Sequence, residues 1–167
     1  GANETLSDVF NPDGRFGGGW YRRYHLNMKT GDLSSEQVMD TECEFPTFNT
    51  SLTGLRNEVT YTACSVDNGA NSFFNGISRV TRDGDATVVT LPPGFYGSEP
   101  VFVPKINAAK EDDGYLMEVV YDGFEHKSEL QIYRADDVND QVCSLKLKHH
   151  LPHQFHGFYT PEVFSTT

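Results

Sequence analysis

The chain has 167 residues, which fits one ordinary domain, and its hydrophobic fraction of 37% and aromatic fraction of 13% are enough for a real core. Its formal net charge of −11 at pH 7 argues against nucleic acid as a partner, because no basic stripe is present to neutralise phosphates. The same charge gives little support for binding to anionic lipid, and no apolar run approaches the length of a membrane span.

The expected elements are short strands separated by turns. The first covers residues 20–28, after an irregular lead-in over residues 1–19, and a turn at residues 29–32 returns the chain through residues 33–39. Cys43-Glu44-Phe45-Pro46 is expected to be extended or turning, because a proline biases the preceding residue away from helix. The further expected strands cover residues 57–66, 72–81, 86–91, 101–103, 115–121, 129–134 and 142–147.

The connections between these strands are rich in glycine, asparagine and aspartate, with turns at residues 67–70 and 82–85. Pro92-Pro93-Gly94 breaks the sheet and opens a loop that runs to Glu99. The acidic run Lys110-Glu111-Asp112-Asp113 is interpreted as a contribution to solubility. Residues 135–140 form a polar link that is compatible with a short helical turn.

The pattern as a whole predicts an all-β protein, since no amphipathic helix of three turns can be found. Groups of about four strands, recurring at roughly 40–50 residues, suggest the antiparallel blades of a β-propeller. A β-sandwich is the alternative on pattern alone, because no blade signature repeats along the chain.

Three widely spaced cysteines, Cys43, Cys64 and Cys143, include no CxxC pair, which argues against a structural zinc site. An odd number without a disulfide framework fits a reducing compartment. The N-terminus has no basic region followed by an apolar one, as a secretory signal would have. We therefore expect a cytoplasmic protein, and peripheral association with membranes stays open.

Four of the six histidines lie between Lys146 and Tyr159. His156 stands between aromatic residues in Phe155-His156-Gly157-Phe158-Tyr159, and a neutral imidazole in an apolar wall is a good ligand for a borderline metal. The following glycine lets the backbone come close to something bulky. The alternative is a packed, hydrogen-bonded core histidine. We interpret the other three histidines of this stretch as loop residues without a metal role, because Pro152 prevents a regular helix there. They are His149, His150 and His153.

Several motifs together resemble the carotenoid cleavage oxygenase family, which includes the retinal-pigment-epithelium isomerase, apocarotenoid oxygenases and lignostilbene dioxygenases. The most specific are the stretch from Tyr96 to Pro104 with Glu111-Asp112-Asp113-Gly114-Tyr115-Leu116, and the distal Phe155-His156-Gly157. The weaker matches, in the same order as in the family, are Tyr21-Arg22-Arg23-Tyr24, Lys29-Thr30-Gly31, Cys43-Glu44-Phe45-Pro46 and Ser128-Glu129-Leu130. The resemblance runs over residues 20–160 and leaves residues 161–167 as a tail.

The resemblance implies a seven-bladed β-propeller with ferrous iron on its axis, held by four histidines from different blades. It implies that His156 is the last of these ligands, and that Glu44 and Glu99 are two of the glutamates that hydrogen-bond the ligand imidazoles, as metal-bound histidines commonly require. Three aromatic residues are candidates to line an apolar tunnel for a polyene or stilbene: Phe155, Phe158 and Tyr159. The alternative is that they pack in the core.

The chain departs from the family in one important respect. Three further ligating histidines are expected upstream of Tyr21-Arg22-Arg23-Tyr24, but no histidine precedes that segment in this chain, and His25, which directly follows it, matches no ligand motif. The chain therefore looks like the C-terminal portion of a non-haem iron(II) dioxygenase that inserts O2 across a conjugated C=C bond, inactive when isolated. The alternative is a non-catalytic β-sheet module for binding or self-association. Unpaired blade edges predict a homo-oligomer in either case.

Overall fold

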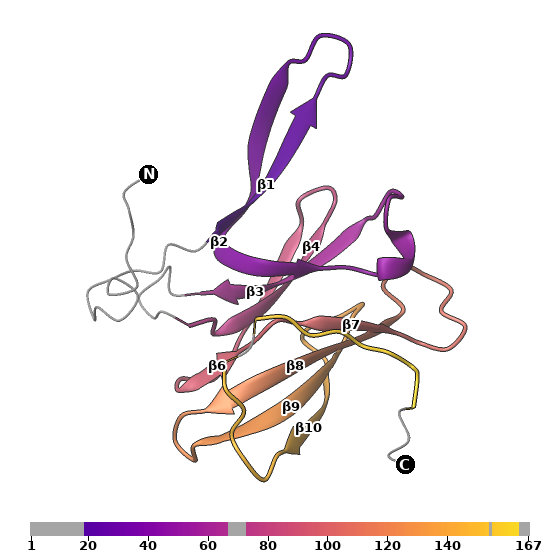
Figure 1. Cartoon of the computed structure of the whole chain (residues 1–167). Coiled ribbons are helices and arrows are strands. Elements are labelled where there is room, and N and C mark those ends of the chain that lie inside the picture. The colour runs from indigo at the N-terminus through magenta and orange to yellow at the C-terminus, as the bar shows by residue number, and fades with distance from the viewer. Residues whose placement is uncertain (1–18, 67–72, 154, 164–167) are drawn as a thin grey trace, which may run out of the picture.

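A computed structural model describes residues 19–66, 73–153 and 155–163, which form two antiparallel β-sheets (Figure 1). The first sheet has the strand order β1-β2-β3-β4-β5, and the second has the order β10-β9-β8-β6, with β7 also paired to β8. The strands are β1 (Gly19–Leu26), β2 (Leu33–Thr47), β3 (Val59–Ser65), β4 (Gly76–Thr81), β5 (Ala86–Thr90), β6 (Phe95–Gly97), β7 (Val101–Pro104), β8 (Gly114–Asp122), β9 (Lys127–Arg134) and β10 (Gln141–Lys146). The one helical element among the described residues is a 3-10 turn, η1 (Thr50–Leu52).

The all-β prediction is confirmed, but four local predictions need correction. The return strand after the first turn does not end at residue 39, because β2 continues to Thr47 and includes Cys43-Glu44-Phe45-Pro46. The loop expected after Pro92 contains the short strand β6. The strand expected from residue 72 begins only at Gly76. Residues 135–140 form a turn without helix, closed by the Asp140 N–H donating to the Asp137 carbonyl at 3.0 Å.

Some sequence-based predictions lie outside the described residues. These are most of the lead-in over residues 1–19, the turn at residues 67–70, and the end of the tail over residues 161–167.

The turn end of the β1–β2 hairpin extends beyond the other strands of the first sheet (Figure 1). Its turn is closed by the Gly31 N–H donating to the Asn27 carbonyl at 2.8 Å, and Gly31 has φ +79°, where glycine is favoured. The large hydrophobic side chains that this hairpin leaves exposed are Trp20, Tyr24, Leu26, Met28 and Leu33. The hairpin therefore presents apolar surface that the rest of the described chain does not cover.

The main core lies between the two sheets. Tyr61 of β3 stacks on Phe102 of β7 with ring centroids 6.0 Å apart and an interplanar angle of 11°. The Tyr61 hydroxyl donates to the Ala135 carbonyl at 2.9 Å, so the buried ring also satisfies its polar end. The other buried members of this core cluster are Val59, Ile77, Leu116, Tyr133, Ala135 and Val138. Burial of these side chains fixes the angle at which one sheet lies on the other.

The acidic run at residues 110–113 joins the sheets rather than serving only solubility. Glu111 accepts hydrogen bonds from the backbone N–H groups of Glu58 and Val59 at 2.8–2.9 Å. Asp112 receives the Arg79 guanidinium at 2.6 Å, with both side chains largely buried. Charge-assisted hydrogen bonds of this kind are stronger than neutral ones. The run is thus an inter-sheet clamp, which corrects the sequence-based interpretation.

Glu118 of β8 is an ionisable residue buried among the side chains that pack between the two sheets. Its side chain is 1% exposed, and neither carboxylate oxygen has a hydrogen-bond partner among the described residues. Burial raises the pKa of Glu118 to about 8, because the charged form is disfavoured away from water. A Cβ at Gly97 would overlap Glu118 Oε1, so the carboxyl occupies the space that this glycine leaves.

Candidate metal centre

Glu44 lies at an irregularity in the pairing between β2 and β3. Glu44 pairs with Ala63 and Thr47 pairs with Tyr61, so three steps along β2 face two along β3. The extra residue makes a β-bulge, and Phe45 within it has φ +55°. A bulge re-aims the side chains around it, and here Glu44 is exposed.

Glu99 lies at the equivalent place in the second sheet, between β6 and β7. Gly97 pairs with Val120 and Val101 pairs with Met117, so four steps on the first strand face three on β8. One extra residue is again accommodated at the glutamate, and its side chain is 16% exposed. The sequence motifs around Glu44 and Glu99 therefore encode the same local backbone device in two successive sheets.

The C-terminal strap, defined here as residues 147–159, brings His156 to Glu99. It leaves β10 and crosses back over the second sheet, as the yellow segment in Figure 1 shows. The Leu147 N–H donates to the Ser128 carbonyl at 2.9 Å, and the Leu151 N–H donates to Ser128 Oγ at 2.8 Å.

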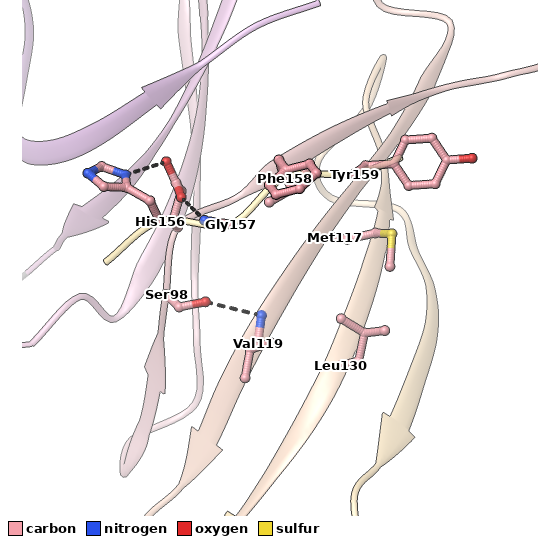
Figure 2. A pocket seen from close by; sticks show the side chains of 10 residues that line it. Ser98, Met117, Val119, Leu130, His156, Gly157, Phe158 and Tyr159 are labelled. Atoms are coloured by element: carbon pink, nitrogen blue, oxygen red, sulfur yellow. Dashed lines mark hydrogen bonds and ion pairs between the residues drawn. The ribbon is translucent and has the colours of Figure 1, made fainter. Parts of the chain in front are cut away.

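Of the two glutamates expected to hydrogen-bond ligand imidazoles, Glu99 is the one that contacts His156. His156 Nδ1 lies 3.2 Å from Glu99 Oε1, and the Gly157 N–H donates to Glu99 Oε2 at 2.8 Å (Figure 2). Because a carboxylate only accepts, Nδ1 carries the hydrogen of this contact. In the neutral ring the lone pair then lies on Nε2, and the imidazole side chain is 75% exposed. The arrangement leaves Nε2 free to bind a metal ion.

Glu44 makes no hydrogen bond with His156 among the described residues, and its neighbour Phe45 makes the contact instead. The rings of Phe45 and His156 meet edge to face, with centroids 5.6 Å apart at 90°. Phe155 also meets Phe45, at 6.4 Å and 86°. The bulge in the first sheet thus supports the strap through an aromatic ring rather than through the carboxylate.

Two neighbouring pockets follow the strap. The first, of about 200 Å³, has Met117, Val119 and Leu130 on the sheet side and His156 to Tyr159 on the strap side (Figure 2). The second, of about 500 Å³, shares Phe158 and Tyr159 with the first. Phe158 and Tyr159 thus line both pockets, whereas Phe155 lines neither of these two.

Three other expectations about the histidine-rich end can be compared with the structure. A Cβ at Gly157 would meet only Val101, at 3.9 Å, so contacts within the described chain do not require glycine there. His149, His150 and His153 lie outside the strands, as predicted. Within residues 19–66, 73–153 and 155–163, no group of three or more His, Cys, Asp or Glu side chains is placed to hold a metal ion.

Sequence reasoning missed two residues that build the site. Ser98, 9% exposed, accepts the Val119 N–H on its hydroxyl at 3.2 Å and so closes the gap between β6 and β7 (Figure 2). For Phe45 the sequence predicted only the backbone conformation, but its ring also contacts His156. Ser98 directly precedes Glu99, and Phe45 directly follows Glu44. These positions next to the two glutamates were the signal available in the sequence, because a bulge beside a site re-aims the neighbouring side chains.

Comparison with known proteins gives the class to which this fold and site belong. The family model described as retinal pigment epithelial membrane protein matches residues 4–161. The chain belongs to this family, the carotenoid cleavage oxygenases, and the resemblance carried by its motifs is confirmed.

The related proteins are oxygenases with longer chains. The apocarotenoid-15,15'-oxygenase of Synechocystis sp. is 29% identical over 137 residues, which are 81% of this chain and 28% of the relative. The carotenoid 9,10(9',10')-cleavage dioxygenase of Crocus sativus is 33% identical over an alignment of 152 positions, which covers 82% of this chain and 28% of the relative. This chain thus spans less than a third of the length of these relatives.

Solved structures give the same relationship. A cobalt-substituted apocarotenoid oxygenase from Synechocystis superposes with a TM-score of 0.78 at 28% identity, covering 83% of this chain and 29% of that one. The two sheets described here are antiparallel blades of the β-propeller that the family forms, and the chain covers only part of that propeller. No helix in the described part of the chain has the length and apolar character needed to cross a bilayer.

Proposed function

We propose that this chain supplies the C-terminal blades of an iron(II) dioxygenase that cleaves a conjugated C=C bond of a carotenoid, apocarotenoid or stilbene. The observation that carries the proposal is the Glu99–His156 contact, which holds Nδ1 and leaves Nε2 free. A carboxylate that fixes the tautomer and orientation of an imidazole is the usual support of a metal-bound histidine. The oriented imidazole of this site therefore fits one ligand position of an all-histidine iron centre.

His156 is proposed as one iron ligand, with Glu99 orienting it. Glu44 is proposed to orient another ligand imidazole, because it lies at the equivalent bulge and is exposed with no hydrogen bond to His156. Ferrous iron, when bound, would supply the activation of O2 for insertion across the double bond, which yields two carbonyl products. A single imidazole holds a metal weakly, so the isolated chain is proposed to be inactive.

The substrate is proposed to be an apolar polyene or stilbene. Phe158, Tyr159 and Val101 line both the pocket that His156 lines and its larger neighbour, together with other largely apolar side chains. An apolar pocket with few polar groups suits a long hydrocarbon substrate and keeps water away from the reacting bond. Phe155 is proposed to act through Phe45, as part of the wall that holds His156.

The test is a chimera in which this chain replaces the matching segment of the Synechocystis apocarotenoid oxygenase. Iron per chain and the loss of polyene absorbance are measured under anaerobic loading followed by O2. We expect iron retention and turnover in the chimera, loss of both in His156→Ala, and retention in the matched control His150→Ala. A folded chimera whose His156→Ala variant keeps its iron and its turnover would remove His156 from the proposed centre.

A second function, self-association, is favoured by exposed apolar surface. The β1–β2 hairpin projects with its hydrophobic side chains uncovered, and Val142 and Leu145 are exposed on the edge strand β10. An unpaired strand edge is a template for pairing with another chain. We propose that the isolated chain forms homo-oligomers, in a reducing compartment such as the cytoplasm, where the free thiols of Cys43, Cys64 and Cys143 persist.

A further inference from the structure

We propose that His153 is a positioning residue, which anchors the C-terminal strap on a cluster of aromatic rings so that His156 meets Glu99. The inference rests on the proposed function, because it concerns how this chain presents the same imidazole. It adds a role for a histidine that the metal centre does not use.

The strap has little burial to hold it in place. Every described residue from Lys148 to Tyr159 is exposed, so the position of the segment depends on a few specific contacts. Its first part is held through Ser128, whose backbone and hydroxyl contact Leu147, His149 and Leu151. Its last part is held through Glu99 and Phe45. Surface segments with so few buried contacts open at low energetic cost unless something pins their middle.

His153 supplies that middle contact. Its ring stacks on Phe73 with centroids 4.4 Å apart and an interplanar angle of 16°. The same ring meets Tyr121 of β8 at 5.8 Å and 67°, so it is held from two sides. The packing of its ring against these neighbours lowers the pKa of His153, which favours the uncharged imidazole, the form suited to packing on a phenyl ring.

The rings that receive His153 are themselves fixed. Tyr121 has its hydroxyl 2.8 Å from His126 Nδ1, and Phe73 meets Tyr96 edge to face at 5.6 Å. The cluster therefore joins the loop before β4, the strand β6 and the strand β8 at one place on the surface. A ring docked there sets where the strap lies three residues before His156, because the chain between the two positions is short.

The experiment measures the strap directly in the 167-residue chain by NMR. Two reporters are followed: hydrogen exchange of the Gly157 amide, which donates to Glu99, and the Nδ1 chemical shift of His156. His153→Ala is expected to speed Gly157 exchange by about threefold to tenfold, the loss expected from one aromatic pair, and to move the His156 resonance. The amide of Val120, in the core strand β8, is expected to exchange at an unchanged rate.

Matched variants separate positioning from general packing. His153→Phe keeps a flat uncharged ring and is expected to restore both reporters, while His150→Ala, an exposed histidine of the same strap, is expected to change neither. Phe73→Ala is expected to reproduce His153→Ala, and the double variant to add little to either single change, since the two rings act as one contact.

Two results would overturn the inference. One is Gly157 exchange and a His156 resonance that stay unchanged in His153→Ala. The other is a rise in exchange shared equally by Gly157 and Val120, which would mean general destabilisation rather than anchoring. Neither readout involves iron, so failure of the iron-ligand proposal in the chimera and failure of the anchor proposal in this chain are seen in separate experiments.

Discussion

Glu118 is expected to make the stability of this chain fall as pH rises through the neutral range. Below about pH 4.5 the carboxyl is protonated in the folded and the unfolded chain, and its full contribution to stability is present. Between that pH and about 8, the unfolded chain releases the proton that the folded chain keeps. The free energy of unfolding should therefore fall by about 1.4 kcal/mol per pH unit from this group alone.

The assay is urea unfolding followed by circular dichroism at about pH 5.5 and about pH 7.5. The slope given above predicts that Glu118 contributes a loss of about 3 kcal/mol between these two conditions. Glu118→Gln carries no titrating group at this position, so it is expected to remove that loss, whatever its effect on stability at a single pH. The difference between the two proteins isolates Glu118, because both share every histidine, including His153, whose lowered pKa acts in the opposite direction.

A matched control is Glu125→Gln, which changes an exposed glutamate in the turn after β8. We expect this variant to keep the pH dependence of the parent chain. If Glu118→Gln loses as much stability as the parent between the two pH values, the carboxyl does not hold its proton in the folded chain. The reasoning from burial without a partner would then be wrong.

Three further predictions concern the clamp, the inter-sheet layer and assembly. Glu111→Ala leaves backbone N–H groups of Glu58 and Val59 without their acceptor, and should lower the unfolding free energy in urea by about 1–3 kcal/mol; an unchanged midpoint would contradict the clamp. Gly97→Ala should lower the unfolding free energy in urea by about 1–3 kcal/mol, and Glu118→Ala in the same chain should recover part of that loss, because the new Cβ overlaps Glu118 Oε1. Light scattering of the purified chain should give a dimer or larger species, and a stable monomer at high concentration would contradict self-association through exposed edges.

The strand pattern was predictable because alternation and turn residues report local geometry. The turn at Gly31 and the strands β3 and β8 follow directly from such signals. The prediction failed where pairing with a distant strand decides the structure. The strand β6 forms because Phe95 to Gly97 pair with β8. A segment of only three residues is too short to show an alternating pattern of its own, so the sequence did not predict this strand.

The site was predictable in part for a similar reason. The motifs around Glu99 and His156 identified both partners of the hydrogen bond, although 57 positions separate them. The roles of Glu118 and His153 were not predictable, because each depends on what the neighbouring sheet or loop places against it. A glutamate within an alternating strand gives no sign of whether a partner will meet it, and a histidine in a loop gives no sign of the ring on which it will stack.

The bulge at Glu99 means that the site is specified by the number of residues as well as by their types. Successive side chains in a strand point to opposite faces, so one residue more or less reverses the direction of all that follow. Removing Ser98 would leave the composition of the motif almost intact and would still turn Glu99 away from the face that His156 approaches. Among homologous chains, the spacing between the glycine of β6 and the proline before β7 is therefore as informative as the glutamate between them.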